Sequence, residues 1–285
     1  MTIRQRISDA EWQARLDLAA CYRLVARYGM ADLIYNHITV RVPGEEGHIL
    51  INPFGYLYEE ITASCLYKID LAGNVVDKPG DVPYEVNQAG YVIHSAIHSA
   101  RHDIACVLHT HTRAGMAVAT MECGLMPATQ GALRFHDRIA YHAFEGPAVD
   151  EAERERLVAD LGDKDVMILR NHGLLTCGRS VAETFLLMQR LETACKVQVD
   201  FLAANTPLHM PSPEAVAKTA RILAPPTVTD RKGSEASLGN WNGQREWSAL
   251  LRQLDRDDPS WRECTLCVRG ALPFSMPAPS GGTSP

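Results

Sequence analysis

The stretch Ile104-Ala105-Cys106-Val107-Leu108-His109-Thr110-His111 decides how the rest of this chain is interpreted. Its apolar first part predicts a buried strand, and its end places two histidines two positions apart. Because side chains alternate along a strand, both imidazoles point to the same face and can converge on one divalent metal ion. The competing interpretation is a half-exposed strand feature, since the chain holds 11 histidines and one such pair arises easily by chance.

A third candidate ligand stands in Asn171-His172-Gly173, directly after the apolar stretch from Val166 to Leu169. The glycine permits a sharp turn at this point. Three neutral nitrogen donors at two strand ends would leave open coordination positions, which is typical of a catalytic metal site rather than a structural one. The spacing by itself does not bring the two strands together.

Composition restricts the class of protein. The chain has 285 residues, 46% of them hydrophobic and 22% charged, which is ordinary for a globular protein with a large core. The net charge of -6 argues against nucleic-acid binding, which needs a basic face. No apolar stretch is long enough to span a membrane, and the first residues lack an apolar signal core, so we expect a cytoplasmic protein without a membrane partner.

Most of the eight cysteines stand in apolar stretches and are expected to be reduced core residues. The exception is the Cys264-Thr265-Leu266-Cys267 pair, which lacks the second pair of a zinc ribbon and the sequence context of a redox site.

Local patterns predict an alternation of helices and strands. Capping boxes at Ser8–Glu11 and Ser180–Glu183 open two helices, over residues 8–28 and 180–202. Strands are expected at 37–42, 48–51 and 104–111, a hairpin at 67–76, and further helices at 85–99, 113–121 and 246–254. We expect a metal-binding domain over residues 8–206. Residues 207–285 should form a proline-rich, mobile extension with one short helix and a disordered end.

Three other segments are candidates for the site. His94, His98 and His102 stand four apart on one helix face, as a partly exposed stripe or with His94 supporting the metal site. The turn from Asn52 to Gly55 either faces a ligand or only ends a strand. Glu145, near Tyr141 and His142, either serves as an acid or base or is a solvated turn residue.

Taken together, the segments from Tyr22 to Val25, Leu33 to Thr39, Ile51 to Gly55, His109 to His111 and Asn171 to Gly173 resemble the class II aldolase/adducin family, and in particular its adducin-like branch. The resemblance covers roughly residues 10–206 and implies a three-layer α/β/α fold with a mostly antiparallel central sheet. It also implies a homotetramer with active sites between subunits, and it makes His109, His111 and His172 the ligands of one divalent metal per chain (zinc, manganese or iron).

The chain departs from the aldolases of this family at several positions. Their acid/base glutamate, at the start of the helix before the histidine pair, falls on Gly90 here. Their phosphate pocket retains only Asn36, beside which Tyr35 replaces a glycine and would crowd an anion. Their proton-donating tyrosine maps near Gln130 and Gly131. A sugar-phosphate aldolase is therefore not the expected activity.

The preferred hypothesis is a metal-dependent lyase that performs aldol cleavage or decarboxylation on a small non-phosphorylated oxo, hydroxy or aromatic acid. His109, His111 and His172 would bind the metal, Glu145, His136 or Tyr141 would move protons, and Asn36, Asn52 and Gly55 would contact the substrate. One alternative is a non-heme Fe(II) oxygenase, because three histidines on one face leave three positions for substrate and dioxygen. The other alternative is a non-catalytic, adducin-like oligomeric protein.

Overall fold

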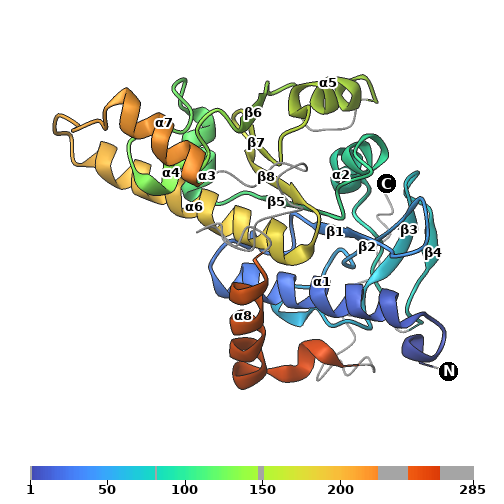
Figure 1. The fold of residues 1–285 in the computed structure, drawn as a ribbon. Coiled ribbons are helices and arrows are strands. Elements are labelled where there is room, and N and C mark those ends of the chain that lie inside the picture. Colours follow the sequence, from blue (N-terminus) through green and yellow to red (C-terminus); the bar gives the residue numbers. More distant parts are fainter. Residues whose placement is uncertain (1, 81, 147–150, 224–242, 264–285) are drawn as a thin grey trace, which may run out of the picture.

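The fold is built on one eight-stranded sheet, seen in a computed structural model that describes residues 2–80, 82–146, 151–223 and 243–263 (Figure 1). The strand order is β4-β3-β2-β1-β5-β8-β7-β6. Every neighbouring pair is antiparallel except β6 and β7. The strands are β1 (Ile38–Arg41), β2 (His48–Ile51), β3 (Tyr67–Asp70), β4 (Val75–Asp77), β5 (Cys106–Thr110), β6 (Ile139–His142), β7 (Val166–Leu169) and β8 (Gly173–Gly178).

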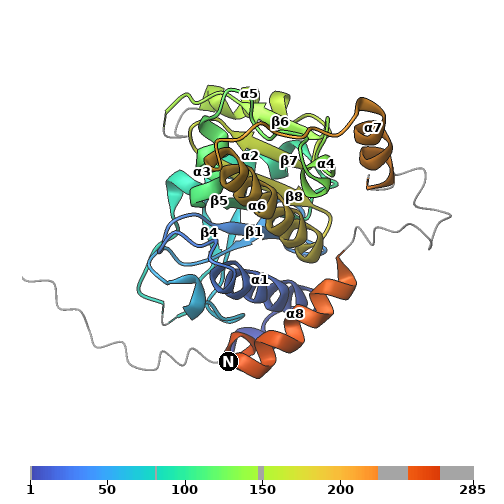
Figure 2. The same ribbon diagram turned by 90° about the vertical axis from the view of Figure 1, so that its left-hand side faces the viewer.

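Helices cover both faces of this sheet. Helices α1 and α6 lie on one face, and α2 and α5 lie on the other (Figures 1 and 2). The α/β/α expectation with a mostly antiparallel sheet is therefore confirmed. The helices are α1 (Asp9–Arg27), α2 (Gln88–Ala100), α3 (Arg113–Thr120), α4 (Gln130–Leu133), α5 (Glu151–Leu161), α6 (Val181–Ala203), α7 (Pro213–Ile222) and α8 (Gln244–Asp257), with short 3-10 turns at Ile3–Gln5, Tyr58–Glu60 and Pro259–Arg262.

Strand β5 shows how the sheet divides the core in two. Cys106 and Leu108 belong to the cluster under α1 and α6, whereas Val107 belongs to the cluster under α2 and α5. Alternation then sends His109 to the α2 side, together with Val107, and Thr110 to the α6 side, where its hydroxyl contacts Met188. The apolar residues of β5 therefore pack into both core layers, and the first candidate ligand, His109, lies near the end of the strand.

The two capping boxes begin the helices that the sequence predicts. The backbone N–H of Glu11 donates to Ser8 Oγ at 3.1 Å, and that of Glu183 donates to Ser180 Oγ at the same distance. Each bond satisfies one of the N–H groups that a helix start leaves free.

Helices α4, α5 and α7 had not been predicted. Helix α7 begins at Pro213, inside the segment expected to be a proline-rich, mobile extension, and it can form because proline at the first position of a helix loses no hydrogen bond. Ser212 caps the same helix through the N–H of Ala215. In α5 the apolar contacts are few, mainly Leu157 and Leu161, so its helical period is weak.

The segment with α8 packs back onto the core. Trp247 is buried, and its indole N–H donates to Asp17 of α1 at 3.1 Å. Trp261 is 1% exposed, and its carbonyl accepts a hydrogen bond from the N–H of Ala63. Residues 243–262 therefore belong to the folded body, in contrast to the mobile extension expected from composition. The Cys264–Cys267 pair and the proline-rich end lie outside the described residues.

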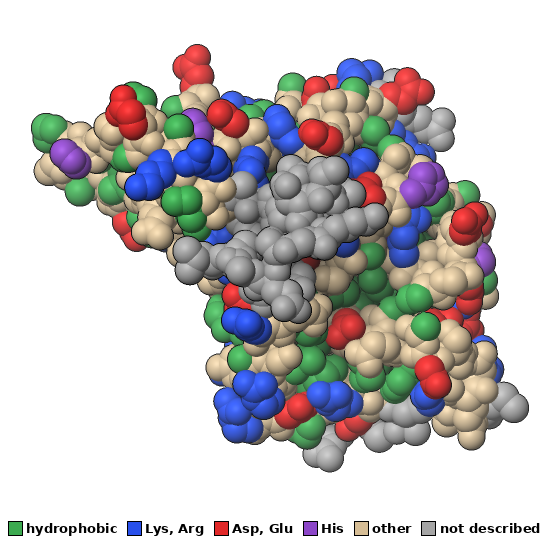
Figure 3. Space-filling view, in the orientation of Figure 1, with side chains coloured by type: hydrophobic (Ala, Val, Ile, Leu, Met, Phe, Trp, Pro, Cys, Tyr) green, Lys and Arg blue, Asp and Glu red, His purple; other side chains and the backbone are tan. Residues whose placement is uncertain are grey.

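Within the described ranges, none of the helices combines the length and hydropathy that a bilayer crossing requires. On the face in Figure 3, basic, acidic and hydrophobic side chains are intermixed over the described surface.

Replacing Trp247 with alanine tests the docking of α8. We expect the free energy of unfolding to fall by about 3 kcal/mol, because a large buried side chain and its hydrogen bond are lost. Urea denaturation measures this change, with Met116→Ala, at an exposed position, as the control that should shift stability by less than about 0.5 kcal/mol. An unchanged midpoint for Trp247→Ala would mean that α8 does not stabilise the core.

Candidate metal centre

Three histidines from two strand ends converge on one point. Nε2 of His111 lies 2.9 Å from Nε2 of His109 and 2.9 Å from Nε2 of His172. The three ring centroids are 4.7 to 4.8 Å apart. The antiparallel pairing of β5 with β8, in which Thr110 lies opposite Leu174, brings the turn that carries His172 beside the histidine pair. The structure thus brings together the three ligands that the sequence proposed.

Hydrogen bonds on the far side of two rings fix their tautomers. His109 Nδ1 is 2.9 Å from the carbonyl oxygen of Leu174, and His111 Nδ1 is 3.2 Å from Oδ2 of Asp32. A carbonyl and a carboxylate can only accept, so both Nδ1 atoms donate. In the neutral rings neither Nε2 atom then carries a proton, and the two atoms, each with a lone pair, are 2.9 Å apart.

This donor set fits a divalent metal. Two lone pairs at that distance repel unless a cation lies between them, and nitrogens 2.9 Å apart can share one ion at the usual zinc–nitrogen distance of about 2.0–2.1 Å. The Leu174 carbonyl and the Asp32 carboxylate match the partners that normally orient metal-bound histidines. In the described part of the chain, these three residues form the one cluster of histidine, cysteine and carboxylate groups with metal-binding spacing.

Burial keeps two of the three imidazoles, those of His109 and His172, uncharged. It lowers the pKa of His109 well below the ordinary value, and the charges of His172, His111 and His37 add to this effect, while the bond to Leu174 opposes it. Burial and then the charge of His111 lower the pKa of His172 to about 4. At neutral pH both rings therefore keep the lone pair that a metal needs.

The turn between β7 and β8 depends on two residues of unusual backbone geometry. Asn171 has a φ of 57°, a left-handed conformation that asparagine tolerates better than most residues. A Cβ on Gly173 would lie 2.4 Å from the carbonyl oxygen of Thr110, and 3.2 Å from the ring of His109. Only glycine lets the two strand ends approach closely enough for His172 to join the pair.

Of the three histidines that the sequence placed on one helix face, His94 and His98 lie in α2, and His102 lies in the turn after its end. His94 and His98 are both fully buried, and each places a ring nitrogen 2.9 Å from Thr39 Oγ1. His102 is exposed. The exposed-stripe interpretation is therefore wrong for the first two, because α2 turns this face onto strand β1. His94 also stacks on His37, with ring centroids 3.9 Å apart.

Asn36 lies in the loop that leads to β1. Its φ is 67°, and its side chain is buried, with neither amide atom hydrogen-bonded within the described residues. The same loop contains Asp32, whose carbonyl accepts a hydrogen bond from the N–H of Tyr35. Asn36 therefore offers a donor and an acceptor only four residues from the partner of His111.

Residues of the turn from Asn52 to Gly55 mainly contact other parts of the protein. Oδ1 of Asn52 accepts a hydrogen bond from the Tyr22 hydroxyl at 2.7 Å, and this hydroxyl also accepts the N–H of Ile38. Gly55 has a φ of 133°, and a Cβ there would lie 2.6 Å from the ring of Tyr84. These contacts give both residues a clear structural role beside the loop that carries Asn36.

The three predicted proton carriers lie away from the histidines within one chain. Tyr141 packs on the α6 side of β6, where its hydroxyl accepts the N–H of Leu125 and its ring lies under the Arg170 guanidinium. His136 is half-buried beside Asp137. Glu145 pairs with Arg156, which holds the pKa of this carboxyl below its usual value. No hydrogen bond or ion pair joins any of the three to His109, His111 or His172 in the described ranges.

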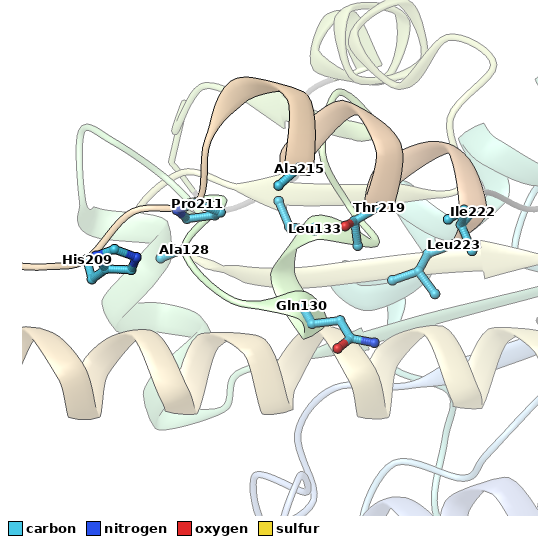
Figure 4. Close-up of a pocket in the computed structure, with 9 residues that line it drawn as sticks. All are labelled: Ala128, Gln130, Leu133, His209, Pro211, Ala215, Thr219, Ile222 and Leu223. Carbon is cyan, nitrogen blue, oxygen red and sulfur yellow. The ribbon is translucent and has the colours of Figure 1, made fainter.

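Two hollows lie apart from the metal centre. One, of about 330 Å³, is lined by His136 and Tyr141 among others. The larger, of about 520 Å³, lies between α4 and α7, with Gln130, Leu133 and Thr219 among its lining side chains (Figure 4). Neither contains a histidine of the triad.

Sequence reasoning missed Asp32 and Thr39. Asp32 stands in an irregular loop without a period, so nothing in the sequence connects it with His111. Thr39 carried a signal, because it is a polar residue between Ile38 and Val40 in a buried strand, a position that usually requires a polar partner.

Comparison with known proteins agrees with this geometry. The family described as Class II Aldolase and Adducin N-terminal domain matches residues 16–199. This chain belongs to that family. A crystal structure of an aldolase II superfamily protein from Pseudomonas syringae is 48% identical, with a TM-score of 0.83, and the match covers 92% of this chain and 100% of that one.

Two further members show how wide the class II aldolase/adducin family is. Alpha-adducin of Mus musculus is 43% identical over 267 residues, which is 93% of this chain and 35% of the adducin. The structure of an L-fuculose 1-phosphate aldolase from Glaciozyma antarctica PI12 is 26% identical, with a TM-score of 0.72, over 89% of this chain and 93% of that one. The relatives of this chain thus include a protein named as an adducin and one named as a sugar-phosphate aldolase.

Gly173→Ala should disturb the metal centre of this family member directly. The added methyl group would press on the Thr110 carbonyl, so we expect a stability loss of about 2 kcal/mol and weaker metal binding. Urea denaturation and metal titration measure the two effects. Gly131→Ala is the matched control, because its nearest atom would be 3.9 Å away and the position is helical, so it should leave metal binding unchanged and should not lower stability.

The stability of the chelator-treated protein should fall as the pH is lowered from about 6.5 to about 4. In this window the unfolded chain takes up the His172 proton, whereas the folded protein does not, because its pKa is lowered to about 4 from 6.5. Urea denaturation at several pH values should show a shallower fall for His172→Asn than for wild type. The variant of the exposed His102, His102→Asn, should keep the wild-type slope.

Proposed function

We propose that this protein is a metal-dependent carbon–carbon lyase that acts on a small non-phosphorylated oxo, hydroxy or aromatic acid. The reaction would be aldol cleavage or decarboxylation. Membership of the class II aldolase family supports the coarse assignment to metal-dependent lyases. The observation that carries it is the pair of facing Nε2 lone pairs on His109 and His111, with His172 beside them.

His109, His111 and His172 would hold one zinc, manganese or iron ion per chain. When bound, such an ion polarises a substrate oxygen and stabilises the negative charge that develops as a carbon–carbon bond breaks. Asp32 and the Leu174 carbonyl keep two of the three rings in the ligating tautomer. The lowered pKa of His172 keeps its ring neutral well below neutral pH.

The substrate would contact the loop from Asp32 to His37. The buried amide of Asn36 supplies one acceptor and two donors without a partner in the described part of the chain. Asn52 and Gly55 shape the neighbouring turn, and Tyr35, which is 49% exposed and stands next to Asn36, would crowd a phosphate group bound as the resemblance to the aldolases implies. These residues around Asn36 support an uncharged or carboxylate substrate rather than a sugar phosphate.

Proton transfer would be carried out by Glu145, His136 or Tyr141 of a neighbouring subunit, since no hydrogen bond among the described residues joins these side chains to the triad of their own chain. The proposed homotetramer, with sites between subunits, would provide that arrangement. Light scattering of the purified protein measures its oligomeric state.

A non-catalytic role is the second candidate, and its support is the 43% identity to alpha-adducin over 93% of this chain. Such a role would leave the fixed tautomers of the triad without a purpose. The metal content of the protein therefore separates the two candidates better than the fold does.

Elemental analysis of protein purified without added metal tests the central claim. We expect about one zinc, manganese or iron ion per chain in the wild type. His111→Ala should lose most of it, because one ligand is removed and two nitrogens bind poorly. Carbon–carbon cleavage is then followed by NMR under argon, with a panel of 2-oxo, 2-hydroxy and phenolic acids.

Two results would contradict this assignment. Metal-free protein at every loading, with His111→Ala equal to wild type, would remove the metal site and favour the adducin-like role. Turnover that requires both Fe(II) and dioxygen, measured as oxygen uptake, would replace the lyase by an oxygenase.

A further inference from the structure

The histidine pair and the two threonines beside it alternate along an extended segment. The Nε2 atoms of His109 and His111 are 2.9 Å apart on the metal side. Thr110 and Thr112 point the other way, and both of their hydroxyls donate to side chains of helix α6. The partner of Thr110 is Sδ of Met188, at 3.3 Å. Helix α6 therefore holds the side of this segment that faces away from the metal.

The partner of Thr112 is a buried carboxylate. Oε2 of Glu192 accepts the Thr112 hydroxyl, and the two residues are only 2% and 6% exposed. The other oxygen of Glu192, Oε1, lies 3.4 Å from Nζ of Lys196, one helical turn further on. Burying a carboxylate costs free energy, whereas an apolar side chain would have no such cost at this position. What the carboxylate adds is a strong, directed hydrogen bond to Thr112.

Thr112 also begins helix α3. Its Oγ1 accepts the N–H of Gly115 at 3.2 Å, so its single proton is the one given to Glu192. A Cβ on Gly115 would lie 2.6 Å from Oγ1 of Thr112 and 2.7 Å from Cγ of Leu174. The start of α3 therefore packs directly on Leu174, whose carbonyl accepts the Nδ1 proton of His109.

These contacts connect Glu192 with two of the three ligands. Thr112 follows His111 in the chain, so a fixed Thr112 side chain restricts the backbone that carries the His111 ring. The packing of α3 on Leu174 restricts the group that orients His109. A metal site requires its ligands within about 0.5 Å of the productive geometry, so a restraint of this kind affects metal affinity.

We propose that Glu192 is a positioning residue of the metal centre, which acts by holding Thr112 and, through it, the rings of His111 and His109. This inference rests on the proposed function, because it requires a metal at the triad. It adds to that function a residue from α6, a helix that supplies none of the three ligands.

A pure charge effect is the alternative explanation for a buried carboxylate in this region. A negative charge attracts a cation whether or not it forms a hydrogen bond. The two explanations differ in what they require of residue 192. Positioning requires an acceptor that reaches the Thr112 hydroxyl, whereas attraction requires only the charge.

Two conservative variants separate reach from charge. Glu192→Gln loses the charge but keeps an acceptor oxygen of the same reach, so we expect an affinity for Co(II) close to that of the wild type. Glu192→Asp keeps the charge but is shorter by one methylene group, so we expect Co(II) to bind about ten-fold more weakly. Competition with a chelator measures these affinities in protein that has first been stripped of metal. The visible spectrum of bound Co(II), which responds to ligand geometry, should change in Glu192→Asp and stay as in the wild type in Glu192→Gln.

Two further sets of variants keep the test valid if Glu192→Asp does not fold or only loses stability. Thr112→Val removes the hydroxyl and should weaken Co(II) binding, whereas Thr112→Ser retains the hydroxyl and should restore it. Trp247→Ala lowers stability through α8, outside these contacts, and should keep the wild-type affinity for Co(II). A loss of affinity in Trp247→Ala as large as that in Thr112→Val would show that metal binding only follows stability, which contradicts positioning.

The order of the affinities decides the outcome. Binding by Glu192→Gln that is no tighter than binding by Glu192→Asp, or equal affinities in Thr112→Val and Thr112→Ser, would overturn the inference and leave the metal site intact. Failure of the wild type to bind Co(II) would instead overturn the proposed function, and this inference with it.

Discussion

The antiparallel pairing of β5 with β8 is the constraint on which the site depends. It places Thr110 opposite Leu174, so the Leu174 carbonyl can accept the Nδ1 proton of His109 while the preceding turn presents His172. The approach is so close that Gly173 has no room for a Cβ. A slip of one residue in this register would turn His109 to the other face of the sheet, and the metal centre would be lost.

Neutral imidazoles dominate the space between α2 and the sheet. His94, His98 and His109 are all buried, and burial is the largest cause of the lowered pKa of each. Keeping uncharged rings in this layer costs little only if their nitrogens have partners, and Thr39 and Leu174 provide several of these. The result is a set of lone pairs fixed in place before any ligand arrives, which is the form of preorganisation that binding and catalysis use.

The class II aldolase/adducin fold here brings together three histidines that could hold a metal, while neighbouring positions differ from the pattern that the resemblance to the aldolases implies. Position 90 lacks a carboxylate, and Tyr35 takes the place of a small residue beside Asn36. The fold alone therefore does not decide the function of this chain, which has to be argued from the residues at the site.

The sequence by itself determined the strand with His109 and His111, the two capped helices and, through family resemblance, the third ligand, because these signals depend on periodicity and local hydrogen bonds. The contacts of Asp32 and Thr39 could not be predicted from the sequence, since their partners lie about 80 and 55–59 positions away along the chain. The packing of Trp247 and Trp261 on the core and the separation of Glu145 from the triad could not be predicted either. Only the tertiary structure decided these contacts, because they depend on which sheet edges and helix faces meet. The burial that results then lowers the pKa of the histidines between them.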